Sequence, residues 1–155
     1  MTKKFIYLAG PIFGVSYKEA VDWRDEIKKM FLPGIVGISP MRLKEFLSKK
    51  RKIGHSYEDD DLSNARAIRT RDKMDVKICD MIVAFMPREM NEKRPSTGTT
   101  MELGWADAFD KPIVLITDDP HLIKHPLTGQ AAGFIVPDIV RAAEVVNGVF
   151  GEYVA

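Results

Sequence analysis

The sequence predicts an α/β fold: a single domain, residues 1–155, in which a mostly parallel five-stranded sheet lies between two layers of helices. Three observations lead to this prediction. Short apolar runs alternate along the chain with longer stretches of helical periodicity. The runs are apolar at nearly every position, which is typical of parallel strands covered on both faces. The length of 155 residues suits one domain with a full core, and no repeat or linker divides it.

The N-terminal part of the chain predicts a strand, a helix and a second strand. Residues 4–10 form an apolar run that ends in Gly-Pro, as expected for a buried strand followed by a turn. Residues 16–31 have apolar side chains at helical spacing, and Ser16 with Glu19 makes a capping box at the start. A Pro-Gly pair ends this helix, and residues 34–40 follow as the second strand.

The middle of the chain is less regular. Residues 41–61 contain a basic stretch, RLKEFLSKKRK, that is compatible with a helix, and then an acidic stretch, SYEDDD. Residues 62–80 predict a helix and residues 81–87 a third strand. The polar residues 88–97 are expected to form a loop.

The C-terminal part predicts two further strand–helix units. A helix is expected to begin near Gly98 and to run to about Phe109. Residues 111–119 form a fourth strand, residues 133–138 a short fifth strand, and residues 137–150 a last helix with a proline near its start. In such folds the functional site lies beyond the carboxyl ends of the strands, so the loops at 9–16, 39–61 and 87–98 matter most.

Composition excludes several classes of protein. The net charge is +1, which gives no electrostatic reason to expect binding to nucleic acid or to an anionic membrane. No apolar run approaches the ~18 residues of a membrane-spanning helix. The single cysteine, Cys79, excludes an internal disulfide and fits a reducing compartment. The N-terminus is interpreted as a strand rather than a signal peptide, so we expect a cytoplasmic protein.

Glu102 is the first candidate functional residue. It lies in the stretch RPSTGTTMELGWADAF among residues that are typical of a core, namely Met101, Leu103, Trp105, Ala106 and Phe109. The expected helix start places Glu102 in the first turn or two, where backbone amides and the helix dipole favour a negative charge. We therefore expect an ionised, inward-facing carboxylate. The alternative is a surface residue that complements the helix dipole.

Asp72 is the second candidate. With Ile68, Val76 and Cys79 it follows a stripe at helical spacing, so it should point toward the core from the middle of its helix. A buried acid needs a partner or a purpose. We interpret Asp72 as an acid held protonated by burial. The alternative is an ion pair with Arg71 or with a basic residue of the 41–52 stretch, such as Arg42.

His121 and His125 are spaced as a metal-binding pair could be on a helix. Prolines flank them and no third ligand is evident, so we reject a metal site and expect loop residues near the mouth of the site. No metal or other cofactor is predicted.

Three blocks of sequence carry a resemblance to a known family. They are IYLAGPIFG (6–14), RDKMDVKICDMIVAF (71–85) and STGTTMELGWA (96–106). Together, in this order and spacing, they resemble the nucleoside 2-deoxyribosyltransferase family, which includes the nucleoside 5'-monophosphate N-glycosidases. The resemblance covers most of the chain and implies a flavodoxin- or Rossmann-like fold.

The resemblance also implies roles for particular residues. Glu102 matches the nucleophile, Asp72 the acid that protonates the leaving base, and Tyr7 a tyrosine that hydrogen-bonds the nucleophile. The substrate would contact the loop after the first strand and the start of the Glu102 helix; the residues implied there are Gly10, Pro11, Ile12, Phe13, Ser96, Gly98 and Thr99. Ser96 stands where transferases of free nucleosides often have Asp, which favours a 5'-monophosphate. The first loop lacks the Arg of phosphate-binding members, so Arg42 or Arg94 would have to replace it.

The function implied is cleavage of the N-glycosidic bond of a nucleoside, or of its 5'-monophosphate, by a retaining double displacement. The sugar would pass to another base or to water, and the protein would be a homo-oligomer. Two alternatives are a hydrolase specific for 5'-monophosphates and a non-catalytic nucleotide-binding domain. A nucleic-acid-binding module built on the basic stretch is disfavoured by the adjoining acids, and nucleotide redox chemistry by the absence of GxGxxG after the first strand.

Overall fold

The protein is described by a computed structural model that covers residues 2–55, 57 and 61–154. A five-stranded sheet in the order β2-β1-β3-β4-β5 forms its centre, and all strand pairs are parallel. The strands are β1 (Lys4–Ala9), β2 (Ile35–Ile38), β3 (Met81–Phe85), β4 (Ile113–Ile116) and β5 (Phe134–Val136). The predicted three-layer α/β fold is therefore confirmed, with strands up to several residues shorter than the apolar runs that predicted them.

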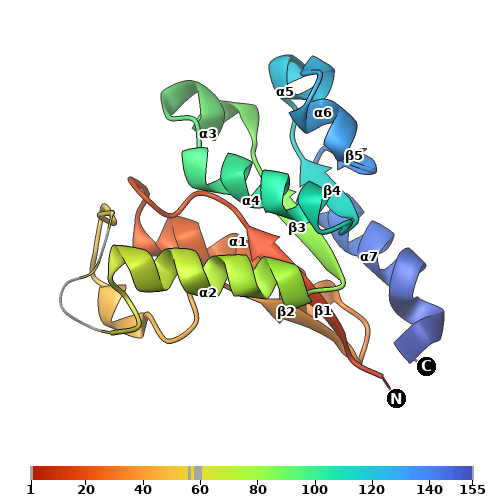
Figure 1. The fold of residues 1–155 in the computed structure, drawn as a ribbon, viewed down its shortest axis with the longest axis horizontal. Helices are drawn as coiled ribbons and strands as arrows, with labels where there is room; N and C mark the ends of the chain where they lie inside the picture. The colour runs from red at the N-terminus through yellow and green to blue at the C-terminus, as the bar shows by residue number, and fades with distance from the viewer. Residues whose placement is uncertain (1, 56, 58–60, 155) are drawn as a thin grey trace.

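Helices cover both faces of this sheet. The helices are α1 (Tyr17–Met30), α2 (Ala65–Ile78), α3 (Arg88–Lys93), α4 (Thr97–Ala108), α5 (Pro120–Lys124), α6 (Thr128–Ala131) and α7 (Ile139–Val154), with a 3-10 turn η1 (Glu45–Leu47). Figure 1 shows α2 and α4 side by side on one face, and α1 and α7 on the other. Alternation along β1 divides its side chains between the layers: Ile6 and Leu8 face α1 and α7, whereas Tyr7 and Ala9 face α2 and α4.

The segment between β2 and α2 has a small core of its own. Met41, Leu47, Ile53 and Tyr57 are buried against Ala20 of α1. The segment is joined to the loop after β1 by backbone hydrogen bonds, including one from the Gly14 amide to the Ile53 carbonyl. The expected helix in the basic stretch is reduced to the 3-10 turn η1, and most of the acidic stretch, residues 56 and 58–60, lies outside the described residues.

The structure differs from the sequence prediction at other connections. Residues 88–97 were expected to be a loop, but they contain α3. Two i,i+4 ion pairs, Arg88 with Glu92 and Glu89 with Lys93, stabilise this helix. The short helices α5 and α6 were not predicted. Met101 was expected in the core but is exposed, because the buried stripe of α4 runs through Thr99, Glu102, Leu103 and Ala106. Across the described part of the chain, the search for a helix long and apolar enough to cross a bilayer finds none.

Candidate active site

A cavity of about 940 Å³ opens beyond the carboxyl ends of β1 and β3. Its walls are formed by the loop after β1, one side of α1, residues 54, 55 and 57, the first half of α2, α3 and the start of α4. Parallel strands end at this edge of the sheet, so the loops that follow them meet here. Of the residues predicted for the site, the cavity wall contains Glu102, Asp72, Gly10, Pro11, Ile12, Phe13, Ser96, Gly98 and Thr99.

Glu102 enters the cavity from the second turn of α4. The helix begins at Thr97, and the Ser96 hydroxyl accepts a hydrogen bond from the Thr99 amide as its N-cap. Glu102 is 8% exposed, and its Oε2 atom is buried without a hydrogen-bond partner among the described residues. A buried, unsatisfied carboxyl oxygen is costly, and such atoms in native structures need an explanation.

Asp72 reaches the same cavity from α2, which packs against α4. The predicted stripe is confirmed at its inner end, where Val76 and Cys79 are fully buried, while Asp72 and Ile68 are half-buried at the cavity wall. Asp72 forms no ion pair with a described residue. The alternative interpretation fails for Arg42, whose guanidinium instead binds Asp75 with two hydrogen bonds of 2.6 and 3.0 Å.

Burial raises the pKa of both carboxyl groups. The pKa of Glu102 rises to about 8, first through desolvation and then through the charge of Asp72. Desolvation likewise raises the pKa of Asp72 to about 6, opposed mainly by the charge of Lys44. The prediction that the helix start keeps Glu102 ionised was wrong, because the dipole effect fades after the first turn and desolvation exceeds it. The two acids titrate as a pair that retains a proton near neutral pH.

Tyr7 lies beneath this pair. Its side chain is fully buried, and its hydroxyl has no hydrogen-bond partner of standard geometry among the described residues. The hydroxyl is nevertheless near enough to Glu102 to lower the pKa of that carboxyl group, and burial raises the pKa of Tyr7 well above 10.0. Tyr7 therefore remains neutral beside Glu102, but the hydrogen bond between them that the resemblance implied is not formed with standard geometry.

Two buried cations near the acids were missed by the sequence interpretation. Arg24 of α1 is fully buried and donates hydrogen bonds to the carbonyl oxygens of Leu8, Gly10 and Ala20, which secures the end of β1. Arg24 follows Ala20 by four residues on the inner stripe of α1, so the rule that identified Asp72 could have found it. Lys44 is 1% exposed, although nothing in its sequence neighbourhood indicates burial.

The mouth of the cavity carries a stack of three side chains. The Arg94 guanidinium lies 4.0 Å from the centre of the Phe13 ring. Phe13 also stacks on His55, with 3.4 Å between the ring centres. Gly14 adopts φ 83°, and a Cβ atom there would collide with Arg94, so only glycine permits this arrangement. Of the two arginines considered for phosphate binding, Arg94 lines the cavity and Arg42 does not.

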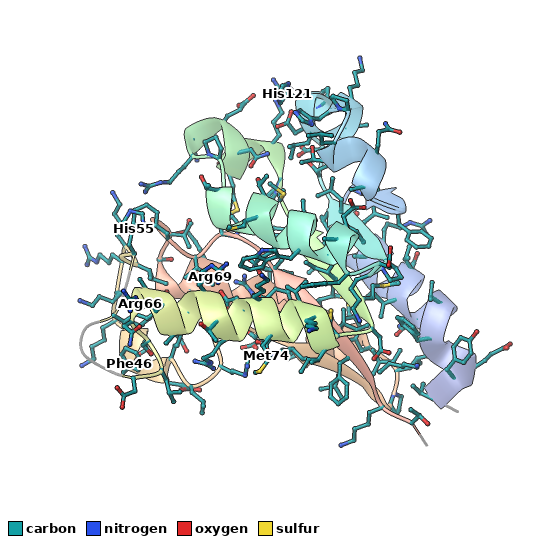
Figure 2. The ribbon with its side chains drawn as sticks, in the orientation of Figure 1. Phe46, His55, Arg66, Arg69, Met74 and His121 are labelled. Atoms are coloured by element: carbon teal, nitrogen blue, oxygen red, sulfur yellow. The ribbon has the colours of Figure 1, made fainter. Side chains whose placement is uncertain are left out.

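His121 and His125 lie elsewhere. They line a separate cavity of about 620 Å³ between α3 and α5, so they are not at the mouth of the Glu102 cavity as expected. Figure 2 shows His121 on α5, well separated from His55. Within residues 2–55, 57 and 61–154, no group of three or more His, Cys, Asp or Glu side chains is arranged to hold a metal ion.

Comparison with known proteins identifies the family. Three solved structures share the fold at low identity. A 2-deoxyribosyltransferase from Bacillus psychrosaccharolyticus has a TM-score of 0.62 at 17% identity and covers 90% of both chains. The CMP N-glycosidase BcmB of Clostridium botulinum has a TM-score of 0.53 at 20% identity, over 93% of this chain and 98% of that one. A molybdenum cofactor binding protein from Rippkaea orientalis has a TM-score of 0.61 at 17% identity, over 97% and 99%.

No curated protein sequence matches the chain. The family model described as nucleoside 2-deoxyribosyltransferase, in contrast, matches residues 6–146, which include every candidate residue of the cavity. This match spans nearly the whole chain, and the chain therefore belongs to the nucleoside 2-deoxyribosyltransferase family.

Proposed function

We propose that the protein cleaves the N-glycosidic bond of a nucleoside or of its 5'-monophosphate through a covalent glycosyl ester on Glu102. One observation carries the proposal: a buried carboxyl group, Glu102, and a half-buried one, Asp72, reach one cavity from adjacent helices, and desolvation raises the pKa of both. Cleavage of this bond needs one carboxylate to stabilise positive charge at C1' and one acid to protonate the departing base.

The chemistry proceeds in two displacements. The first displacement uses the form of the pair in which Asp72 holds the shared proton and Glu102 is ionised. A Glu102 oxygen then bonds to C1' while the bond from C1' to the base nitrogen breaks, and the nitrogen takes the proton from Asp72. In the second, water or another base attacks C1' from the face that the first base left, opposite Glu102, while the bond from C1' to the Glu102 oxygen breaks, and Asp72 accepts the proton that the attacking group loses. Two inversions at C1' give net retention. Tyr7 donates toward the Glu102 oxygen that is not bonded to the sugar.

The cavity wall has features that bear on the 5' end of the substrate. Ser96 and Arg94 favour a phosphate, since neither carries a negative charge and Arg94 is a cation. Four exposed acids on the same wall, Glu19, Asp22, Glu26 and Glu89, oppose one. The backbone amides at the helix start offer little to a phosphate, because the amide of Thr97 already donates to the Pro95 carbonyl and that of Thr99 to the Ser96 hydroxyl.

A chromatographic screen tests the proposal. The protein is incubated with each ribo- and deoxynucleoside and each 5'-monophosphate, with and without a second free base, and the products are separated. We expect release of free base from at least one class, and a new nucleoside with the second base if the sugar is transferred. Absence of base release from every compound, together with nucleotide binding that Glu102→Ala leaves unchanged, would instead identify a non-catalytic nucleotide-binding domain.

A further inference from the structure

Apolar side chains are usually buried and charged ones exposed, but at residues 43 and 44 the opposite holds. Leu43 is 67% exposed, whereas Lys44, the next residue, is 1% exposed. The backbone achieves this with φ 62° at Leu43, a left-handed conformation that is strained for a bulky residue. An apolar side chain is thus placed in water, and a charged one in the interior, at a cost in backbone strain. Strain of this kind concentrates at functional sites.

Among the described residues, the ammonium group of Lys44 faces an aromatic ring rather than a carboxylate. It lies 5.1 Å from the centre of the Tyr57 ring, and it forms no hydrogen bond or ion pair with any described residue. Tyr57 itself lines the Glu102 cavity, so Lys44 lies directly behind the cavity wall. A charge buried without an ion pair among the described residues is costly, which favours a functional reason for lysine rather than methionine at this position.

The charged groups that face Lys44 come from several elements. Arg71 of α2, Arg24 of α1 and the preceding Arg42 repel it, and Asp72 of α2 attracts it most strongly. Glu102 of α4 also experiences the charge of Lys44, but less than Asp72 does. Asp75, the other acid on this side of α2, is already bound by Arg42.

We propose that Lys44 is a positioning residue for the reaction, a buried counter-cation that stabilises the carboxylate of Asp72 once Asp72 has given its proton to the departing base. The inference deepens the proposed function and depends on it. In the first displacement, the O–H bond of Asp72 breaks, an N–H bond forms on the base, and Asp72 is left as a carboxylate in a half-buried site. Lys44 balances that charge until the second displacement returns a proton to Asp72.

Burial and charge act on Lys44 in the way this role requires. Desolvation lowers the pKa of Lys44 to about 8, and the charge of Asp72 is the largest influence that opposes this lowering. Reciprocally, the ammonium charge lowers the pKa of Asp72. Removal of the Lys44 charge should therefore raise the pKa of Asp72 and make the acid a poorer proton donor.

The test compares two neutral variants, Lys44→Met and Lys44→Gln, with the charge-conserving Lys44→Arg. The matched control is Lys73→Met. Lys73 is next to Asp72 in the sequence, but its ammonium group lies over the Trp105 ring. Two quantities are measured: the pH profile of kcat/KM for base release, and the titration of the Asp72 carboxyl group followed by carbon NMR in the unliganded protein.

We expect both neutral variants to move the pH profile and the Asp72 titration upward by about one pH unit, with Lys44→Arg and Lys73→Met close to wild type. A lower rate with an unmoved profile and an unmoved titration would reduce Lys44 to a packing role and overturn the inference. The NMR titration needs no turnover. If the wild-type protein releases no base at all, the proposed function fails, and the titration still decides whether Lys44 controls Asp72.

Discussion

Two kinds of structure direct side chains toward the cavity region: the helices α2 and α4, which carry the acids, and the irregular segment that carries Lys44. In α2 and α4, regular helical spacing alone turns Asp72 and Glu102 inward. In residues 39–55 and 57, a 3-10 turn, one strained residue and a small separate core together bury Lys44. Regular elements thus hold the reacting groups of the proposed mechanism, while an irregular segment holds the charge that adjusts one of them.

The comparison shows where local rules apply. Regular backbone imposes a periodicity that depends on few neighbours, so side-chain direction follows from sequence position. An irregular segment has no such periodicity, and its side-chain directions follow from the turns and tertiary contacts that it makes. The variants below separate the two regions, beginning with the largest expected effect.

Glu102→Ala removes the group that would bond to C1'. We expect base release to fall by at least ~10³-fold, as for other groups that act together in catalysis, with the fold intact by circular dichroism. Asp107→Asn is the matched control, because it removes an exposed acid from the same helix but outside the cavity wall and should retain near wild-type turnover. A folded Glu102→Ala variant with near-normal turnover would show that the helices do not hold the reacting group.

Asp72→Asn retains the shape of the side chain but removes the proton donor. Base release from ordinary substrates should fall by roughly 10²-fold, because the base must then depart without general acid assistance. A substrate with an activated leaving group, such as a nitrophenyl glycoside of the same sugar, should lose much less. Equal losses for both substrates would indicate a structural role for Asp72.

Glu102→Gln should change the pH dependence of stability. The folded protein raises the pKa of Glu102 from 4.5 to about 8, so the folded state holds this proton more tightly than the unfolded state does. Stability from this group is present at low pH and is lost as pH rises through about 8. The variant does not pay this cost, and its melting temperature should exceed that of wild type by at least about 2 °C at pH 9.

The difference between the Glu102→Gln variant and wild type should shrink toward zero below pH 4.5, where Glu102 is protonated in both states. Differential scanning calorimetry across the pH range measures it. A difference that is constant with pH would mean that folding leaves the pKa of Glu102 unchanged, and a wild type that gains stability over the variant as pH rises would mean that the field of the helix start outweighs burial.

Leu43→Gly addresses the irregular segment. Gly accepts φ 62° without strain, and Leu43 is mostly exposed, so the substitution should stabilise the protein by about 0.5–1 kcal/mol in chemical denaturation. Asp110→Gly is the matched control: Asp110 also has a left-handed φ, 55°, but Asp tolerates that conformation better, so the gain should be smaller. Destabilisation by Leu43→Gly would show that contacts of the Leu43 side chain hold the turn.

The sequence by itself determined the layers of this protein and the direction of its two acids. Strands that are apolar on both faces can be buried only between helices, and the periodicity of a helix places Asp72 and Glu102 on inner faces. These properties depend on neighbours within a few residues of the chain.

Tertiary structure alone decided the electrostatics of the site. The pairing of Arg42 with Asp75 rather than Asp72, the burial of Lys44 and the contact of Arg94 with Phe13 join segments that are distant in sequence. The same holds for the raised pKa of Glu102: a helix start favours the ionised form, but desolvation and the charge of Asp72 oppose it. Desolvation and charge–charge energies depend on every group within several ångströms, and that set exists only once the chain has folded.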